Sequence, residues 1–273
     1  MEQGPIFSIQ GAEFSYKGAS SPAVKNVDLS VASGEWVALL GINGSGKSTL
    51  AKMMNALLIP TRGACFVMGM DTSDPELAAA IRQNVALVFQ NPDDQIVASI
   101  VEEDVAFGPE NLGLPSETIR ARVDRALRLT GLSEMRRRGS YSLSGGQKQR
   151  LALAGALAME PEALILDEST SMLDPEGRAS FLNCLRELNA RGITIVQITH
   201  RMEEVAHASR IVVARSGEVA WDGSPDFFWE EKCAGFGFDI PQELELLRSL
   251  RDGGFVPAGT KPAVHDLLEA LCL

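Results

Sequence analysis

Residues 35–48 read Glu-Trp-Val-Ala-Leu-Leu-Gly-Ile-Asn-Gly-Ser-Gly-Lys-Ser, and this stretch decides the fold. Its apolar first part, which ends at Leu40, predicts a short buried strand. The next residues, Gly41–Ser48, match the pattern G-x-x-x-x-G-K-[ST], and Leu50–Leu57 predict a helix that Pro60 ends. A glycine-rich loop between a strand and a helix is the setting of a phosphate-binding loop. The stretch therefore predicts an α/β domain that binds a nucleotide.

The residue types in this loop suit particular roles around phosphate. The glycines let backbone N–H groups turn toward the β-phosphate, and the following helix adds the positive end of its dipole. Lys47 would neutralise the β- and γ-phosphates, and the hydroxyl of Ser48 would bind Mg²⁺. The expected nucleotide contacts from this loop are Gly41, Asn43, Gly44, Ser45, Gly46, Lys47, Ser48 and Thr49.

Two carboxylates follow a later apolar segment. Ala163–Leu166 predicts a strand, and Asp167 and Glu168 come at its end. That places both side chains at the carboxyl edge of the sheet, where α/β proteins bind ligands. Asp167 suits Mg²⁺, held through a ligand water. Glu168 points the other way and suits orientation or deprotonation of an attacking water.

A second glycine turn opens another predicted helix. Its residues are Ser144, Gly145, Gly146 and Gln147. A helix N-terminus of this kind binds anions, although a plain cap with Ser144 as N-cap is an alternative interpretation. A single nucleotide-binding pocket requires only one phosphate-binding turn, and the glycine loop already provides it. The second cradle therefore fits a nucleotide that is held by another subunit.

The rest of the chain alternates between strand and helix patterns, which predicts a largely parallel sheet with helices on both faces. Further strands are expected at 6–9, 23–29, 85–89 and 193–198, and a closing hairpin at 211–214 and 218–221. Helices are expected at 116–130, 147–158, 177–190, 203–208, 241–251 and 262–271. Residues 91–142 interrupt the alternation and predict an inserted, mostly helical lobe.

Composition narrows the class of protein. The 273 residues carry a formal net charge of −11, which disfavours a nucleic-acid partner because such proteins usually present a basic face. Apolar runs fall short of the roughly 20 residues that cross a bilayer, and the N-terminus lacks the pattern of a signal peptide. The cysteines lack metal-ligand spacing and fit reduced, packed thiols. We expect a cytosolic chain.

Taken together, the motifs resemble those of ATP-binding-cassette (ABC) ATPases, in the same order and spacing over roughly residues 5–230. The segments that match Walker A, Q-loop, signature, Walker B, D-loop and H-loop are Gly41–Ser48, Gln90, Leu143–Gln147, Ile165–Glu168, Ser171–Asp174 and Thr199 with His200. Ser169 and Met172 depart from the usual residues of the Walker B and D-loop motifs, without removing a catalytic group.

The resemblance implies the α/β fold of P-loop NTPases, with a RecA-like core, an antiparallel β subdomain, an inserted helical subdomain and a small C-terminal helical appendage. The ATPase domain would span 5–238, with the helical subdomain at 91–142, and the appendage 239–273. The resemblance also implies ATP and Mg²⁺ as cofactors. Gln90 would lie near Mg²⁺ and the attacking water, and His200 on the γ-phosphate. Tyr16 would stack on adenine, and Asp174 would reach across a dimer interface.

One segment is more specific than the ATPase motifs. Gln90–Leu114 resembles the ATPase subunits of energy-coupling factor (ECF) importers, in which this region forms a groove for the coupling helices of a transmembrane subunit. Contacts would lie around 93–107, where Glu102, Glu103 and Asp104 could pair with arginines. Ser171–Arg178, together with 55–60, resembles the first of two paralogous ATPases. That implies a heterodimer with a second ATPase, with a homodimer as the alternative.

The implied function is ATP hydrolysis that powers uptake of a vitamin or a transition-metal cation. The substrate would be bound by a separate membrane subunit, with which this chain has indirect contact only. The chain would lie peripherally on the cytoplasmic face of the cell membrane. The alternatives are an ATPase of a conventional ABC importer or exporter, a soluble cassette ATPase acting on nucleic acid or ribosomes, and a nucleotide-binding regulator without turnover.

Overall fold

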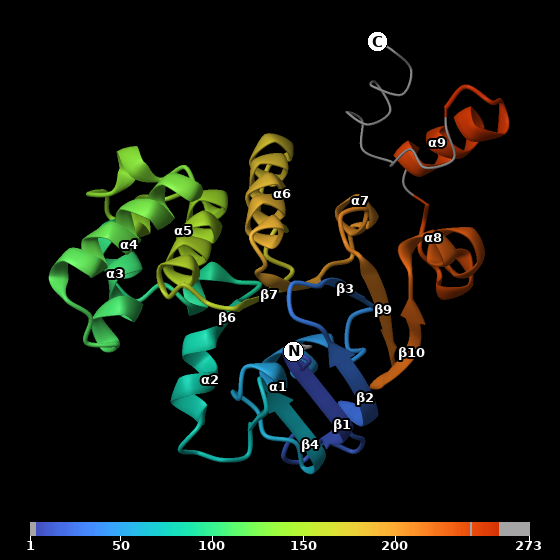
Figure 1. Ribbon diagram of the computed structural model, residues 1–273, viewed down its shortest axis with the longest axis horizontal. Helices are drawn as coiled ribbons and strands as arrows, with labels where there is room; N and C mark the ends of the chain where they lie inside the picture. The colour runs from blue at the N-terminus through green and yellow to red at the C-terminus, as the bar shows by residue number, and fades with distance from the viewer. Residues whose placement is uncertain (1–3, 241, 257–273) are drawn as a thin grey trace.

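The computed structural model describes residues 4–240 and 242–256, and two β-sheets form its frame (Figure 1). The central sheet has the order β10-β9-β3-β8-β7-β6, and neighbouring strands are parallel except for the β9–β10 pair. Its strands are β3 (Trp36–Leu40), β6 (Val85–Val88), β7 (Ala163–Asp167), β8 (Thr194–Ile198), β9 (Arg210–Arg215) and β10 (Glu218–Gly223). The largely parallel sheet and the closing hairpin were both predicted.

The second sheet is antiparallel and has the order β2-β1-β4-β5. Its strands are β1 (Phe7–Phe14), β2 (Val24–Val31), β4 (Arg62–Val67) and β5 (Met70–Asp71). The patterns at 6–9 and 23–29 predicted the first two strands. The other two, and the helix α2 that follows them, were not predicted.

Helices lie on both faces of the central sheet (Figure 1). The α-helices are α1 (Lys47–Met54), α2 (Ala78–Asn84), α3 (Val101–Asn111), α4 (Ser116–Leu129), α5 (Gly145–Ala158), α6 (Pro175–Ala190), α7 (Met202–Val205), α8 (Pro225–Phe227) and α9 (Gln242–Asp252). Shorter 3-10 turns lie at Pro92–Asp94, Ser133–Met135, Ser140–Ser142 and Ala234–Phe236, and a π-helical turn at Phe228–Lys232.

The insert predicted at 91–142 contains α3 and α4, and both pack on α5, which follows the insert, at one side of the molecule in Figure 1. These three helices are called the helical lobe below. The helices α8 and α9 stand at the other side. The helix predicted at 262–271 lies outside the described residues. Among the residues that the structure describes, no helix combines the length and the apolar character needed to cross a bilayer.

Alternation along the central strands builds a hydrophobic core on each face of the sheet. In β3, Ala38 and Leu40 join the core beneath α5 and α6, whereas Val37 and Leu39 join the core beneath α1 and the antiparallel sheet. Successive side chains of a strand point to opposite faces, so a strand that is buried on both sides must be apolar throughout. The sheet edge where the strands end is thereby held rigidly from both sides.

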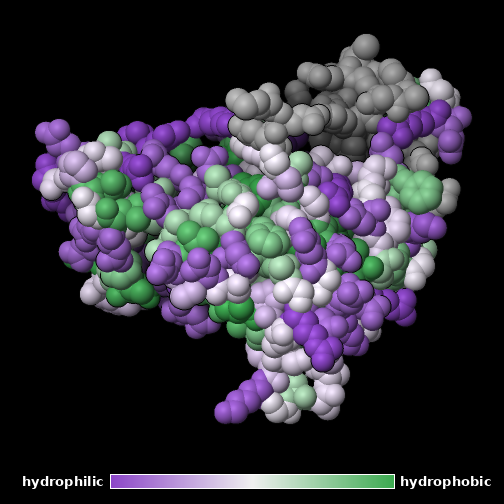
Figure 2. Space-filling view, turned by 60° about the horizontal axis from the view of Figure 1, so that its bottom comes forward, coloured by the Kyte–Doolittle hydropathy of each residue, from purple (hydrophilic) through white to green (hydrophobic). Residues whose placement is uncertain are grey.

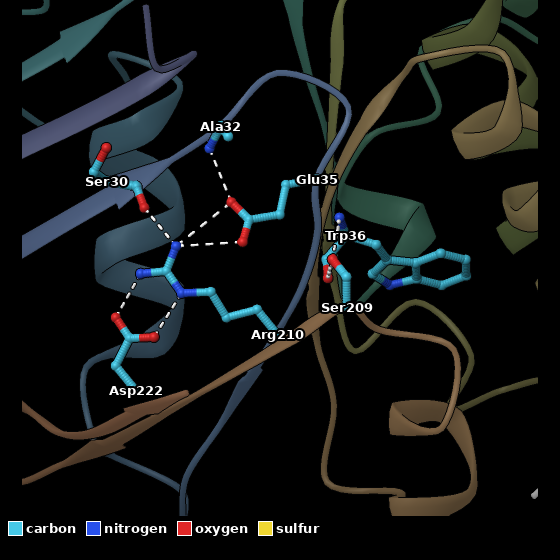
Figure 3. A network of polar contacts seen from close by, with 7 residues as sticks. All are labelled: Ser30, Ala32, Glu35, Trp36, Ser209, Arg210 and Asp222. Carbon is cyan, nitrogen blue, oxygen red and sulfur yellow. Dashed lines mark hydrogen bonds and ion pairs between the residues drawn. The ribbon is translucent and has the colours of Figure 1, made fainter. Parts of the chain in front are cut away.

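A polar cluster around Arg210 ties the two sheets together (Figure 3). Arg210 donates to both carboxylate oxygens of Asp222 on β10, at 2.6 and 2.5 Å, and to the carbonyl of Ser30 on β2, at 2.9 Å. Glu35, just before β3, lies 3.3 Å from the same guanidinium. These carboxylates raise the pKa of Arg210, so the guanidinium stays charged and the cluster fixes the antiparallel sheet against the central one.

Candidate active site

Four neighbouring strands of the central sheet, in the order β3-β8-β7-β6, end at one edge and carry the predicted residues there. The glycine loop follows β3, and Gln90 follows β6. Asp167 and Glu168 lie at the end of β7, and His200 follows β8. The parallel register therefore brings together residues that lie far apart in the sequence, as the strand–loop motifs predicted.

The glycine loop needs glycine at two positions for steric reasons. Gly41 has φ 149°, and a Cβ there would lie 2.3 Å from the carbonyl oxygen of Ala214. Gly46 has φ 103°, and a Cβ there would lie 2.4 Å from the carbonyl oxygen of Ala23. Gly46 is also the N-cap of α1 and makes no side-chain cap, so the first N–H groups of that helix are not satisfied by a capping side chain. This is the geometry of an anion cradle.

Lys47 is the buried cation of the loop. Its Nζ donates to the carbonyl oxygens of Gly41, at 2.8 Å, and Ile42, at 3.0 Å, and the residue is 5% exposed. Burial lowers the pKa of the ammonium group, and the nearby carboxylates of Glu168 and Asp167 oppose that shift. The lysine is therefore held between the loop and the carboxylates at the end of β7.

Ser48 and Asp167 form a hydrogen-bonded pair of oxygen ligands beside the loop. Burial raises the pKa of Asp167, while the hydrogen bond from the Ser48 hydroxyl lowers it. A hydroxyl and a carboxylate in contact are the hard oxygen donors that Mg²⁺ prefers, and bound phosphates and waters would complete the shell. The pair therefore fits a Mg²⁺ ion, which would neutralise charge on the phosphates.

Glu168 is the centre of a convergent group. Its carboxylate accepts a hydrogen bond of 2.9 Å from the side-chain amide of Gln90, and His200 Nδ1 lies 3.5 Å from the same oxygen. The backbone is left-handed at Glu168, with φ 49°, and its N–H donates to Ile198 of β8 at 3.0 Å. A non-glycine residue in this region is uncommon, and this backbone turns the chain sharply after β7. The group can hold a water for attack on a phosphate.

Tyr16 lies next to the glycine loop. Its hydroxyl is 3.1 Å from the hydroxyl of Thr49 on α1, and its ring meets that of Phe14 edge to face, with centroids 4.9 Å apart. The residue is nevertheless 45% exposed. An exposed ring that is fixed at two points offers a platform for a flat ligand beside the phosphate cradle.

The second glycine turn lies on the helical lobe. Ser144 is the N-cap of α5 and forms a capping box with Gln147, with hydrogen bonds of 2.9 and 3.3 Å. The cap interpretation is confirmed, and the anion-binding role stays a prediction. A Cβ at Gly146 would lie 3.2 Å from Leu173, and one at Gly145 would lie 3.4 Å from Met172. This turn therefore packs against the segment 171–174.

The remaining predicted residue, Asp174, is exposed and is the N-cap of α6. Its carboxylate accepts from the N–H of Gly177 at 3.0 Å. Such a cap leaves part of the carboxylate open to solvent, so a role at a subunit interface is compatible with it. That role stays a prediction.

The acidic run 102–104 corrects one expectation. Asp104 does not face solvent, because it is buried and its carboxylate accepts from the N–H groups of Val97 and Ala98, at 2.7 and 2.9 Å. Glu102 is paired with Arg136 at 2.8 Å. Glu103 is exposed and Glu102 is half-buried, so the expectation is wrong for Asp104, and pairing of Glu102 or Glu103 with an arginine of a partner stays a prediction.

A groove lies between the helical lobe and the central sheet. It encloses about 300 Å³ and is lined mainly by apolar groups, among them Val97 and Phe107, with Arg82 at its border. Val97 and Phe107 are both exposed. Figure 2 turns the lower side of the molecule forward and shows hydrophobic groups lying in patches among hydrophilic ones.

Sequence reasoning missed a buried polar cluster next to this edge of the sheet, which centres on Glu204 of α7. Its partners are Thr170, Arg178, Gln197 and Thr199. It also missed Gln149 of α5, whose side chain donates to the carbonyl of Phe89 at 3.1 Å and ties the helical lobe to the segment that carries Gln90.

Comparison with protein families and curated proteins gives consistent matches. A family model described as ABC transporter matches residues 24–171. The energy-coupling factor transporter ATP-binding protein EcfA1 of Clostridium novyi is 50% identical over 256 residues, which cover 93% of this chain and 91% of the relative. EcfA1 of Symbiobacterium thermophilum is 51% identical over 253 residues, covering 92% of this chain and 88% of the relative.

Solved structures agree in fold. A structure of cbiO1 from Clostridium perfringens, described as part of the ABC transporter complex cbiONQ, has a TM-score of 0.77 at 34% identity and covers 91% of this chain and 95% of its own. The ATP-binding cassette MJ0796, described as a dimer in a post-hydrolysis state bound to ADP and Pi, has a TM-score of 0.74 at 30% identity, with coverage of 80% and 98%.

Proposed function

The chain belongs to the ATP-binding subunits of energy-coupling factor transporters within the ABC transporter family, and we propose that it powers uptake of a vitamin or a transition-metal cation. It is an ATP hydrolase coupled to transport. The family resemblance predicted from the motifs is thereby confirmed. A separate membrane subunit would bind the transported substrate and would therefore determine which substrate is taken up.

The observation that carries the proposed site is the convergence of Gln90 and His200 on Glu168, beside the Ser48–Asp167 pair. The loop residues 41–49 would hold the phosphates of ATP, with Lys47 against the β- and γ-phosphates and Tyr16 against adenine. Asp167 and Ser48 would hold Mg²⁺, with Gln90 near it. Glu168 would orient the attacking water, and His200 would contact the γ-phosphate.

We propose that the site is completed by a second ATPase subunit. The turn 144–147 is a further helix N-terminus on the helical lobe, and it lies beside the exposed segment that carries Asp174. In a closed dimer this turn would cap the nucleotide of the partner, and Asp174 would lie at the interface. The resemblance of Ser171–Arg178 to the first of two paralogous ATPases supports a non-identical partner, with a homodimer as the alternative.

The groove lined by Val97 and Phe107 supports the contact with a transmembrane coupling subunit. Its lining includes Gln95, Val97, Asp104 and Phe107 from the expected region 93–107, together with residues of the central sheet and of α5. An apolar helix end seated there would press on both parts at once. The chain would accordingly sit peripherally at the cytoplasmic face of the cell membrane.

The ATPase assignment is tested with Glu168→Gln in the assembled transporter. The amide keeps the shape and hydrogen bonds of the side chain but cannot take a proton, so hydrolysis should fall by about 10²- to 10⁴-fold. ATP binding should persist, and a closed, ATP-loaded dimer should accumulate on gel filtration. Glu218→Gln, at an exposed position of β10, is the control. Undiminished steady-state hydrolysis by Glu168→Gln would exclude the proposed role of Glu168 in orienting the attacking water.

The groove is tested separately with Phe107→Glu, which places a charge on its apolar wall. We expect loss of copurification with the membrane subunits and retention of ATP binding by the free chain. Phe227→Glu is a matched control, because Phe227 is 44% exposed against 48% for Phe107 and lies on α8 at the other side of the molecule. Equal copurification of both variants would exclude this groove as the docking site.

A further inference from the structure

Glu204 is a buried carboxylate that lies next to the sheet edge at which Glu168 lies. It is 1% exposed, although its neighbour Glu203 on the same helix is exposed. A charged carboxylate is costly to bury unless several donors satisfy it. Such a group is retained where its contacts do something that an apolar side chain of the same size would not do.

The donors to Glu204 come from segments that carry catalytic groups. Thr170, two residues after Glu168, donates its hydroxyl to Glu204 Oε1 at 2.5 Å. Thr199, the residue before His200, donates to Oε2 at 2.8 Å. The Thr199 hydroxyl also accepts from the N–H of Arg201 at 3.0 Å, so it has two partners.

A third donor links Glu204 to the middle of the sheet. Gln197 of β8 donates its amide to Oε2 at 3.0 Å. The amide oxygen of Gln197 accepts from the indole N–H of Trp36 at 3.1 Å, which settles the orientation of the amide. Trp36 begins β3 and is drawn in Figure 3, where its backbone meets Ser209. Glu204 is therefore anchored to the strand that leads into the glycine loop.

The fourth contact reaches the segment 171–174. Arg178 of α6 places its Nε 3.7 Å from Glu204 Oε1, and its Nη2 donates to the carbonyl oxygen of Leu173 at 3.0 Å. Leu173 in turn lies against the turn that opens α5, at Gly146. One carboxylate is thus connected to the Glu168 loop, to the residue before His200 and, through Arg178, to the exposed segment that carries Asp174.

We propose that Glu204 is a positioning residue for ATP hydrolysis, which holds the Glu168 loop, His200 and the segment 171–174 as one unit. This inference rests on the proposed function, in which a second subunit approaches Asp174. Pressure on the segment 171–174 is then transmitted through the 3.7 Å ion pair of Arg178 with Glu204, and from Glu204 through its hydrogen bonds with Thr170 and Thr199 to the two catalytic side chains. Glu204 touches no nucleotide and acts through its neighbours.

The test uses Glu204→Gln, with Glu203→Gln as the matched control on the same helix, in the full chain assembled with its transporter subunits. The amide keeps the size of the side chain but replaces one acceptor oxygen by a donor. We expect kcat to fall by about 10- to 100-fold, with KM for ATP and the Kd of a fluorescent ATP analogue within about twofold of wild type. A purely structural role would lower Tm and leave the kcat of the folded fraction unchanged.

Thr170→Val and Thr199→Val provide a second route if Glu204→Gln fails to fold. Each removes one donor and leaves the carboxylate with its other partners, so each should lower kcat with KM unchanged. Combined with Glu204→Gln, the Thr170→Val change should cost less than it does alone, which is the signature of residues acting through one contact. Wild-type kcat in folded variants of both threonines, or full additivity, would overturn the proposal.

The experiments distinguish failure of the positioning role of Glu204 from failure of the proposed function. If wild type hydrolyses ATP and Glu168→Gln does not, the site assignment stands whatever Glu204→Gln does. If the assembled wild-type protein hydrolyses no ATP, the proposed function fails first. If Glu204→Gln hydrolyses ATP at the wild-type rate while Glu168→Gln is inactive, only the positioning role of Glu204 is lost.

Discussion

The side-chain amide of Gln90 donates a hydrogen bond of 2.9 Å to the carboxylate of Glu168. Gln90 follows β6 and stands just before residues that line the groove, whereas Glu168 stands at the end of β7. A shift of the helical lobe would therefore move the residue that holds the catalytic carboxylate. Gln149 strengthens this link, because it fastens α5 to the carbonyl of Phe89, next to Gln90.

We expect Gln90→Ala to release the Glu168 side chain and to lower kcat by about 10- to 100-fold, the usual cost of misplacing a catalytic group. ATP binding should be retained, because Lys47 and the glycine loop are untouched. Steady-state hydrolysis and nucleotide titration measure the two effects. Gln83→Ala, at an exposed position on α2, is the control. Loss of ATP binding without a change in kcat would contradict the role given to Gln90.

Tyr16 should contribute to affinity for adenine and little to the chemical step. Stacking of a base on an aromatic ring contributes about 1–3 kcal/mol, so Tyr16→Ala should raise the Kd for ATP by about 5- to 150-fold. Tyr16→Phe keeps the ring and loses only the contact with Thr49, and should stay within about threefold of wild type. Titration with a fluorescent ATP analogue measures the Kd of each variant. Equal affinities of Tyr16→Ala and Tyr16→Phe would exclude stacking.

Gly41→Ala should damage the phosphate loop for a steric reason. The added Cβ would lie 2.3 Å from a backbone oxygen that cannot move without displacing β9. We expect a loss of about 1–3 kcal/mol in stability and a clear weakening of ATP binding. Gly155→Ala in α5 is the contrast, because a Cβ there meets no atom within 4 Å and should be neutral or stabilising by up to about 1 kcal/mol. Chemical denaturation of the two variants measures whether each substitution raises or lowers the free energy of unfolding.

Much of the site was predictable because its residues follow strands. A motif places the glycine loop or Glu168 directly after a strand, and parallel pairing then brings the ends of these strands to one edge without further information. Strand β4 escaped prediction because its pairing with β1 is non-local and it contains Gly63. Strand β5 has only two residues and pairs with β4 alone, so its pattern is too short to predict a strand. Helix α1 ends at Met54, earlier than Pro60 suggested, because Asn55 caps it.

The burial of single charged residues was not predictable. Glu203 and Glu204 are adjacent and chemically identical, and only the packing of α7 buries one and exposes the other. The expectation that the acids of the run 102–104 all face a partner was wrong for Asp104 for a related reason. Consecutive residues of a helix point about 100° apart, so three adjacent acids cannot share one face. Asp104 consequently turns inward to the N–H groups of the 97–98 loop, whereas Glu103 stays in solvent.

Asp167 makes stability depend on pH. Burial raises its pKa, with a smaller contribution from the charge of Glu168, while Ser48 and the charges of Lys47 and Lys52 partly oppose the shift. A carboxyl whose folded pKa lies above its unfolded value binds its proton more tightly when folded. It therefore favours folding below the unfolded pKa, and that contribution is lost as the pH rises through the folded pKa. At neutral pH the ionised group costs stability.

We expect Asp167→Asn, which keeps the shape and removes the charge, to raise the Tm of the nucleotide-free protein at about pH 7.5. The gain should shrink as the pH falls toward about 4, the ordinary pKa of an aspartic acid, because wild-type Asp167 is then protonated. Added Mg²⁺ and ATP should stabilise wild type more than the variant. Thermal unfolding followed by circular dichroism measures the Tm at each pH and with added Mg²⁺ and ATP. Asp226→Asn, at an exposed position, is the control. A lower Tm than wild type at pH 7.5 would show that the ionised carboxylate is stabilising.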